Sequence, residues 1–298
     1  MSKVAFYAMN LKGYFVVKKF IEKFGSNSIS YIVSSKDGQI KEDCFKAIEA
    51  LAIRSKIKFV DRFENIVELE SLPNVYKFAI GWRWLIKNEN NLIIFHDSLL
   101  PKYRGFAPLV NSLLNKELRG GVTALLASSE YDKGDIVAQE SIKLDYPVKI
   151  DEVIEQIKPV YFNLVVKIFQ DINKGVQLCI SKQNEANATY SLWLDDQDYY
   201  IDWNWNAEKI KRFIDAVGYP YDNAKAYLNG EIVKFVDVEI VKDVVIEHRD
   251  RHIGKVIFVK GGMPTIVCTD GLLGLIDIRD EKGNVMFINF RSRFESKR

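Results

Sequence analysis

The sequence contains few cysteines for its length. Its 298 residues include only Cys44, Cys179 and Cys268, which lie far apart and form no CxxC pair. This pattern indicates neither a disulfide framework nor a zinc knuckle. A reducing compartment, the cytoplasm, is the location we expect.

A strong net charge and a long apolar run are also missing. The 42 basic and 40 acidic side chains leave a net charge of +2, without the basic excess typical of a dedicated nucleic-acid binder. The apolar run at the N-terminus is too short for a signal peptide. No stretch approaches the roughly 18 apolar residues needed to cross a membrane. The sequence therefore predicts no membrane partner and makes nucleic acid an unfavoured one.

Two further motifs are absent. Neither GxGxxG nor GxxxxGK followed by Ser or Thr occurs, so no dinucleotide or ATP is implied. His248 and His252 stand at i and i+4, but no third metal ligand accompanies them. We expect no metal site.

The first half alternates short apolar runs with helical patterns, which is typical of α/β proteins. Helical spacing recurs around Val16–Phe24 and Phe45–Leu51, and a long helix is predicted between Asp151 and Gly175. This alternation predicts a Rossmann-like, mostly parallel sheet with helices on both faces. The predicted strands are Lys3–Ala8, Ile29–Val33, Ile57–Val60, Val75–Ile80 and Leu92–Phe95.

A polar stretch, Ser181–Ala188, reads as a linker, and the texture changes beyond it. A helix over Ala207–Ala216, capped by Asn206, is followed by strand-like runs separated by Asn-Gly, Gly-Gly and Lys-Gly turns. We expect a small OB-like β-barrel there. The predicted domains are residues 1–182, which carry catalysis, and residues 190–298, which form the β domain. The predicted strands are Ile232–Phe235, Gly254–Val259, Thr265–Cys268 and Gly271–Ile278.

The segment from Leu92 to Gly105 is the best candidate for chemistry. An apolar strand ends at His96, and a loop bounded by Pro101 and Gly105 follows. Ligands of open α/β sheets gather at the carboxyl ends of strands. His96 is therefore placed to act on a ligand, although a structural histidine remains an alternative at this point.

The run His96–Gly105, HDSLLPKYRG, resembles the HxSLLPxxRG signature of folate-dependent formyltransferases. Asp132–Asp135, 36 residues after His96, resembles the DxGD loop of the same family. Ile201–Trp203 and Tyr219–Pro220 extend the likeness, which covers essentially the whole chain.

The resemblance implies a formyl donor, N10-formyltetrahydrofolate, and an amine acceptor. It implies that His96 is the general acid/base and that Asp132 is its partner. Histidine is suited to proton transfer near neutral pH. Without the resemblance, the more common role for Asp132 in an Asp-x-Gly turn would be to cap the loop. The implied folate-binding residues are Trp84, Leu85, Ile86, Phe106, Ser128, Ser129, Glu130, Tyr131 and Asp132, and the implied substrate-binding residues are Lys102, Tyr103 and Arg104.

One position departs from the family pattern. Where the family has an asparagine two residues before the histidine, this chain has Ile94, which offers no donor to the formyl oxygen. Asn90 and Asn91 are expected at the other end of the strand. Losing one oxyanion donor can cost on the order of a hundredfold in rate.

The acceptor is the least determined element. A tRNA acceptor needs many phosphate contacts, but residues 201–298 carry a net charge of only about +1. We therefore expect a nucleotide-linked aminosugar. The alternatives are methionyl-tRNA, a formylation domain related to peptide-synthetase tailoring, and a catalytically silent binder of folate or nucleotide sugar. The base, the sugar, the amine and a homodimer are left open.

Overall fold

The computed structural model describes residues 2–38 and 40–296 and divides into two compact units. The first unit comprises Met1–Ser112, Leu118–Leu144 and Glu152–Leu192. The second comprises Trp193–Arg298 together with Leu113–Glu117 and Asp145–Asp151. No sequence pattern had assigned these last two short segments to the second unit.

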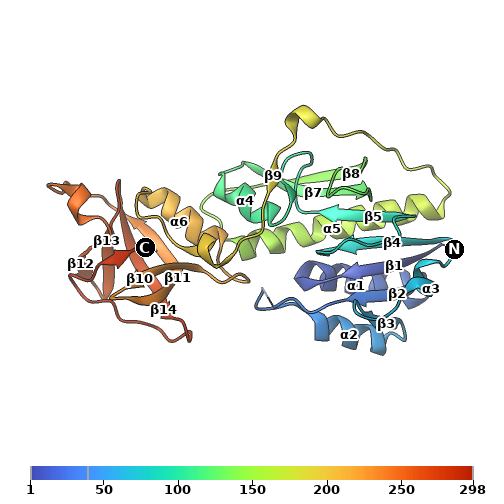
Figure 1. Ribbon diagram of the computed structural model, residues 1–298, viewed down its shortest axis with the longest axis horizontal. Helices are drawn as coiled ribbons and strands as arrows, with labels where there is room; N and C mark the ends of the chain where they lie inside the picture. Colours follow the sequence, from blue (N-terminus) through green and yellow to red (C-terminus); the bar gives the residue numbers. More distant parts are fainter. Residues whose placement is uncertain (1, 39, 297–298) are drawn as a thin grey trace. The chain divides into compact units, whose positions relative to one another are not determined.

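The first unit is built on a seven-stranded sheet of order β3-β2-β1-β4-β5-β7-β8 (Figure 1). The pairs among β1 to β5 are parallel, and β7 pairs antiparallel with both β5 and β8. The mostly parallel sheet is thus confirmed, with an antiparallel edge that the sequence analysis did not predict. The strands are β1 (Lys3–Ala8), β2 (Ile29–Ser34), β3 (Lys58–Asp61), β4 (Val75–Ile80), β5 (Leu92–His96), β7 (Arg119–Leu126) and β8 (Ile136–Lys143).

Three long helices cover one face of this sheet: α1 (Asn10–Phe24), α2 (Phe45–Arg54) and α5 (Ile150–Asn173). Phe6 of β1 and Phe169 of α5 both pack against Phe20 of α1, with ring centroids 5.1 and 4.9 Å apart. A fully buried phenylalanine contributes about 1.5–3 kcal/mol through removal of apolar surface from water. This aromatic layer therefore fixes α1 and α5 on the same side of the sheet.

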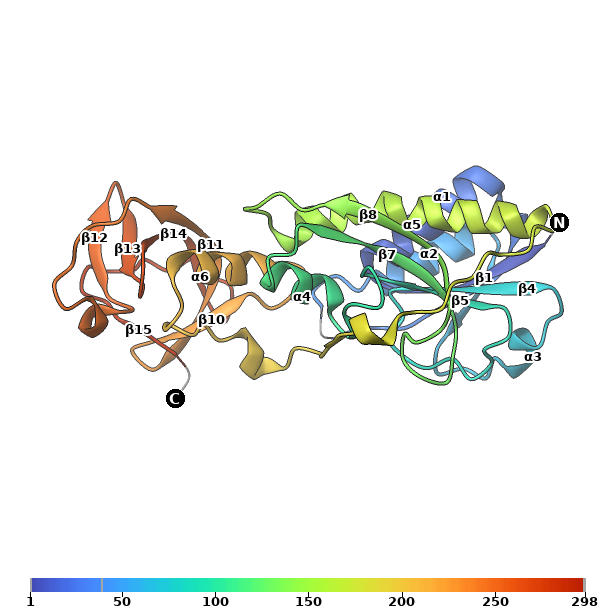
Figure 2. The same ribbon diagram turned by 90° about the horizontal axis from the view of Figure 1, so that it is seen from above.

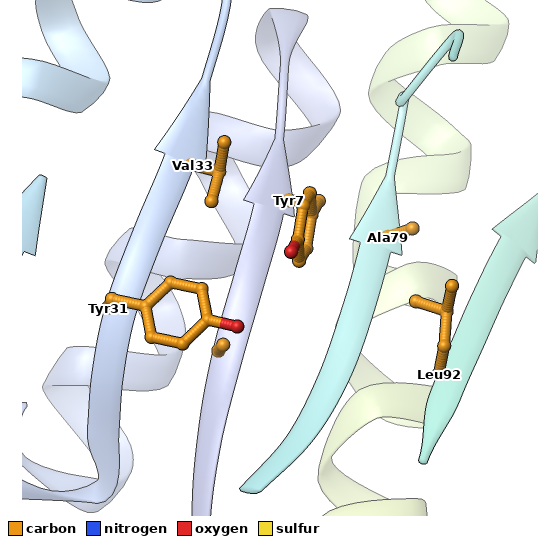
Figure 3. Close-up of a cluster of buried hydrophobic side chains, with 6 residues drawn as sticks. Tyr7, Tyr31, Val33, Ala79 and Leu92 are labelled. Atoms are coloured by element: carbon orange, nitrogen blue, oxygen red, sulfur yellow. The ribbon is translucent and has the colours of Figure 1, made fainter. Parts of the chain in front are cut away.

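The opposite face carries a cluster of buried side chains: Ala5, Tyr7, Tyr31, Val33, Ala79 and Leu92 (Figure 3). The long helices lie behind the strands in that view. The four-residue α3 (Val67–Glu70) covers this face through Leu69 (Figure 2). Helices on both faces had been expected, but the coverage is unequal because loops replace long helices over this cluster.

The second unit contains α6 (Ala207–Ala216) and a six-stranded sheet of order β12-β13-β14-β11-β10-β15. Asn206 caps α6 by accepting the backbone N–H of Lys209 at 2.8 Å, as predicted. Trp203, which precedes α6, packs on Phe235 and Phe294 and so forms part of the core of this unit. The curled antiparallel sheet agrees with the small β-barrel expected. Its strands are β10 (Ala224–Leu228), β11 (Glu231–Val241), β12 (Val256–Lys260), β13 (Met263–Val267), β14 (Leu272–Asp280) and β15 (Phe294–Glu295).

The remaining elements are short. Helix α4 spans Pro108–Leu114, and β6 (Arg104–Gly105) pairs in parallel with β9 (Tyr190–Ser191). Four 3-10 turns complete the described chain, at Ser26–Ser28, Glu185–Asn187, Asp196–Tyr199 and Arg249–His252. None of the helices in the described ranges is both long enough and apolar enough to cross a membrane.

Candidate active site

His96 is the last residue of β5, a strand held between β4 and β7. Side chains alternate along a strand, so His96 projects from the same face as Ile94 and Leu92, the face that lacks long helices. Only 8% of His96 is exposed. Asn91 lies just before the other end of β5, as predicted, and is too far along the strand to replace Ile94.

Both ring nitrogens of His96 face oxygen acceptors. Nε2 lies 2.7 Å from the carbonyl oxygen of Tyr103, and Nδ1 lies 3.5 Å from Oδ2 of Asp132. The first distance is that of a hydrogen bond, whereas the second is longer than an ordinary hydrogen bond and brings a carboxylate close to the ring. The ring of His96 is therefore held between a carbonyl oxygen and a carboxylate.

Asp132 reaches His96 because the connection from β7 to β8 folds back. Oδ2 of Asp132 also accepts the backbone N–H of Gly105 at 2.8 Å, which ties the two sequence motifs together. The backbone of Asp132 is left-handed, with φ of +54°, a conformation that aspartate tolerates better than most residues.

The glycine of the Asp132–Asp135 loop is required by close packing. A Cβ atom on Gly134 would lie 1.7 Å from the carbonyl oxygen of Leu126. Because that oxygen belongs to the backbone of β7, no side-chain movement relieves the clash. The loop can therefore return toward His96 only with glycine at this position.

Hydrogen bonds also fix the loop that follows His96. Ser98 Oγ donates to the carbonyl oxygen of Lys102 at 2.7 Å. Thr123 Oγ1 donates to the carbonyl oxygen of Ser98 at 2.6 Å, and it accepts from the backbone N–H of Leu100 at 3.1 Å. Tyr103 has a left-handed φ of +60°, which is strained for a bulky residue. The strain is held at the residue whose carbonyl contacts His96.

Asp97, the acidic neighbour of His96, does not contact it. Its carboxylate instead accepts hydrogen bonds from Lys12 of α1 and Tyr161 of α5. The side chains of Lys12 and Asp97 are 10% and 12% exposed. These hydrogen bonds anchor Asp97 to α1 and α5. The contacts could not be predicted from the position of Asp97 next to His96 in the sequence.

The three predicted substrate-binding residues have different surroundings. Lys102 is exposed and Tyr103 is half-buried, but Arg104 is completely buried. The Arg104 guanidinium donates to Gln183, Glu185 and the hydroxyl of Tyr190. The hydrogen bonds that Arg104 donates to the Glu185 carboxylate raise the pKa of the guanidinium. The segment Ser181–Ala188, interpreted as a linker, therefore supplies two partners to the signature arginine.

The predicted folate segment Trp84–Ile86 follows β4, whose last residue pairs with Phe95 beside His96. Leu85 is 61% exposed, and Trp84 stacks under the guanidinium of Arg62 at 3.9 Å. The backbone groups of Trp84–Ile86 make no hydrogen bond within the described chain. Main-chain donors and acceptors are therefore available there to a ligand.

The second predicted wall, Ser128–Tyr131, is exposed apart from Ser128, whose hydroxyl donates to the carbonyl oxygen of Glu130 at 2.8 Å. Tyr131 is 49% exposed, and its ring lies 6.0 Å from that of Phe106. The structure thus brings Phe106, which follows the His96–Gly105 motif, next to the second wall. Within the residues described, no group of three potential ligands could hold a metal ion.

Two family models match the chain. The model "Formyl transferase" matches residues 75–166, and "Formyl transferase, C-terminal domain" matches residues 194–292. The first range contains the site around His96 and Asp132, and the second falls within the second structural unit.

Relatives in sequence include methionyl-tRNA formyltransferases. That of Clostridium tetani is 26% identical over 286 residues, covering 91% of this chain and 90% of the relative. That of Borrelia turicatae is 28% identical over 204 residues, covering 68% of this chain and 64% of the relative.

Similar solved structures include sugar formyltransferases. WlaRD, a sugar 3N-formyl transferase solved in the presence of dTDP and 5-N-formyl-THF, superposes with a TM-score of 0.70 at 19% identity, over 92% of this chain and 97% of that one. The N-formyltransferase from Helicobacter canadensis, in complex with folinic acid and dTDP-3-aminofucose, gives 0.70 at 17% identity over 92% and 98%. The signature loops, the two matched models and the shared fold agree: this chain belongs to the formyltransferase family of formyl-transferring enzymes.

Proposed function

We propose that the chain transfers a formyl group from N10-formyltetrahydrofolate to the amine of a nucleotide-linked aminosugar. The observation that carries the proposal is the position of His96, held between the Tyr103 carbonyl and the Asp132 carboxylate beside the loop that follows β4. Acyl transfer to an amine needs a group beside the formyl donor that can both accept and donate a proton.

When bound, the folate supplies a formyl carbon that is open to attack by the amine. The amine nitrogen forms a bond to that carbon, loses a proton, and the bond from carbon to N10 breaks as N10 gains a proton. His96 carries the proton between the two nitrogens through Nε2, which exchanges its contact with the Tyr103 carbonyl oxygen for the substrate. Asp132 stabilises the charged ring through Nδ1, which is the role of a carboxylate beside a catalytic histidine. The backbone N–H of Gly105 keeps that carboxylate oriented.

The developing oxyanion needs a donor, and Ile94 has none. Protonated His96 and the main-chain groups of the surrounding loops can serve as donors in its place. We infer that the pocket has been rebuilt around Ile94, whose side chain packs against the buried cluster of Figure 3.

The acceptor assignment rests on charge and on the solved neighbours. Both neighbours with a TM-score of 0.70 are sugar N-formyltransferases. A diphosphate needs few positive charges, which is consistent with a net charge of about +1 over residues 201–298. The rival is a methionyl-tRNA acceptor, which the sequence relatives favour.

One assay separates the two acceptors. The purified chain and N10-formyltetrahydrofolate are incubated with a panel of dTDP- and UDP-linked aminosugars, including dTDP-3-aminofucose, or with charged initiator tRNA. We expect formylation of an aminosugar and none of the tRNA at physiological salt. Formylation of tRNA that falls steeply as salt rises would replace the sugar acceptor with tRNA.

His96→Asn tests the mechanism itself. Acid–base catalysis typically contributes about 10²–10⁴-fold, so turnover should fall by a hundredfold or more without loss of folding. Near-normal turnover in this variant would remove His96 from the mechanism. Folate binding without turnover by the unmodified chain would favour the silent binder.

A further inference from the structure

The segment Ser181–Ser191, here named the strap, runs beside both signature loops. At its start, the backbones of Ser181 and Ile136 exchange two hydrogen bonds, of 2.8 and 2.9 Å. At its end, the backbone N–H of Arg104 donates to Thr189, and that of Phe106 donates to Ser191. The strap is therefore tied to the start of β8 and to the His96–Gly105 motif.

A single side chain of the strap bridges the two motifs. Gln183 Oε1 accepts from Arg104 Nε at 3.0 Å and from Nη2 at 2.8 Å. Gln183 Nε2 donates to the carbonyl oxygens of Asp132 and Gly134 at 2.6 and 2.8 Å. The amide thus uses both of its donor hydrogens and both acceptor lone pairs.

Glu185 has a different task in the same cluster. Its two carboxylate oxygens accept from Arg104 Nη1 and Nη2 at 2.9 and 2.6 Å, a bidentate pair. The Arg104 side chain is 0% exposed, whereas that of Glu185 is 65% exposed. Glu185 therefore balances the charge of Arg104 from the solvent side, while Gln183, which is neutral, connects Arg104 to the Asp132 loop.

We propose that Gln183 is a positioning residue for the His96–Asp132 pair. Asp132 is held on one side by the Gly105 N–H to its carboxylate, and on the other by Gln183 at its backbone carbonyl. Its left-handed backbone relaxes when the second hold is lost, and the carboxylate then leaves its place near Nδ1. This inference rests on the roles proposed above for His96 and Asp132.

Gln183→Glu removes the hold with almost no change of shape. A glutamate still accepts from Arg104, but it has no hydrogen for the carbonyls of Asp132 and Gly134 and places a negative charge against them. Misplacement of a catalytic group by about 1 Å can cost on the order of a hundredfold. We expect kcat to fall about ten- to a hundredfold, with the KM for the folate within about twofold of the original value.

Glu185→Gln is the matched control, since it changes the same cluster by one charge but leaves the Gln183 bridge intact. We expect kcat within about threefold of the original. The double variant Gln183→Glu/Glu185→Gln restores the net charge and returns one carboxylate and one amide to Arg104. We expect its Tm to recover while kcat stays low. Recovery of kcat would show that Gln183 only serves to anchor Arg104, and would overturn the proposal.

A measurement on the free protein needs no substrate. The chain has three histidines, so the imidazole ¹⁵N resonances can be assigned by their loss in His96→Asn. The Nδ1 resonance of His96 should move in Gln183→Glu and in the double variant, and keep its position in Glu185→Gln. An unmoved Nδ1 resonance in Gln183→Glu overturns the proposal. Failure of the proposed function is seen separately, as normal turnover in His96→Asn.

Discussion

Restoring the family's asparagine at Ile94 tests how this site stabilises negative charge. Ile94 lies in β5 between Ala79 and Leu125 and packs against the buried cluster beneath His96. The substitution Ile94→Asn therefore places an amide where the surroundings are largely apolar. Two consequences can be measured separately, one on stability and one on rate.

The cost in stability follows from burial. Losing part of the apolar contact of a half-buried isoleucine, and burying an amide with few partners, together cost about 3 kcal/mol. For a unit of this size that lowers Tm by about 6–12 °C. Ile94→Val is the control, because it trims the same contact without adding polarity and should cost about 1 kcal/mol.

The effect on rate distinguishes a rebuilt pocket from a merely lost donor. We expect kcat of Ile94→Asn at saturating folate to stay within about threefold of the original, because a rebuilt pocket would already supply other donors to the oxyanion. If the site has merely lost a donor, restoring asparagine should instead raise kcat tenfold or more. The KM for the folate should stay unchanged, because the contact forms mainly in the transition state. That gain would refute the rebuilt pocket.

Two further changes test the site loop and the second unit. Gly134→Ala should lower the unfolding free energy by about 3 kcal/mol or more and abolish most of the turnover, because its Cβ would lie 1.7 Å from the Leu126 carbonyl oxygen. Gly38→Ala is the control: its Cβ would have no atom within 4 Å, so stability and turnover should not change. Burial alone would raise the pKa of Asp222, but hydrogen bonds from Lys225 and a second lysine hold it below its ordinary value of 3.8. Because this pKa is lowered in the folded state, the charged carboxylate stabilises the fold above pH 3.8, and that stabilisation is lost as the pH falls through the folded-state pKa. Thermal melts of the original chain and of Asp222→Asn should therefore differ at pH 7 and approach each other as the pH falls below 3.8.

Local patterns were enough to predict several elements of both units. β1, β4 and α6 begin and end at the predicted residues, and α1 ends at Phe24, where the predicted helical spacing ends. These elements have strong apolar periodicity and clear caps, which depend only on neighbouring residues. β7 and β8 escaped prediction because Gly120, Gly121 and the mixed polar run of β8 give no alternating pattern, and pairing with β5 is what makes them strands.

The strap was misread for a related reason. Polar composition made Ser181–Ala188 look like a solvated connection, yet Gln183 and Glu185 are bonded to a buried arginine some 80 residues earlier. A polar composition indicates that a segment can be exposed to solvent. It does not show whether a residue distant in the sequence forms hydrogen bonds with the same polar groups.

The sequence by itself determined the family and the residues of the candidate site: His96 at a strand end and Asp132 in an Asp-x-Gly loop. The tertiary structure decided the arrangement. It turned Asp97 toward Lys12 and Tyr161, buried Arg104 against the strap, and left His96 between two oxygens. The residue type alone decides whether a side chain can donate or accept a hydrogen bond. Which partner it contacts depends on strands and loops that meet only after the chain has folded.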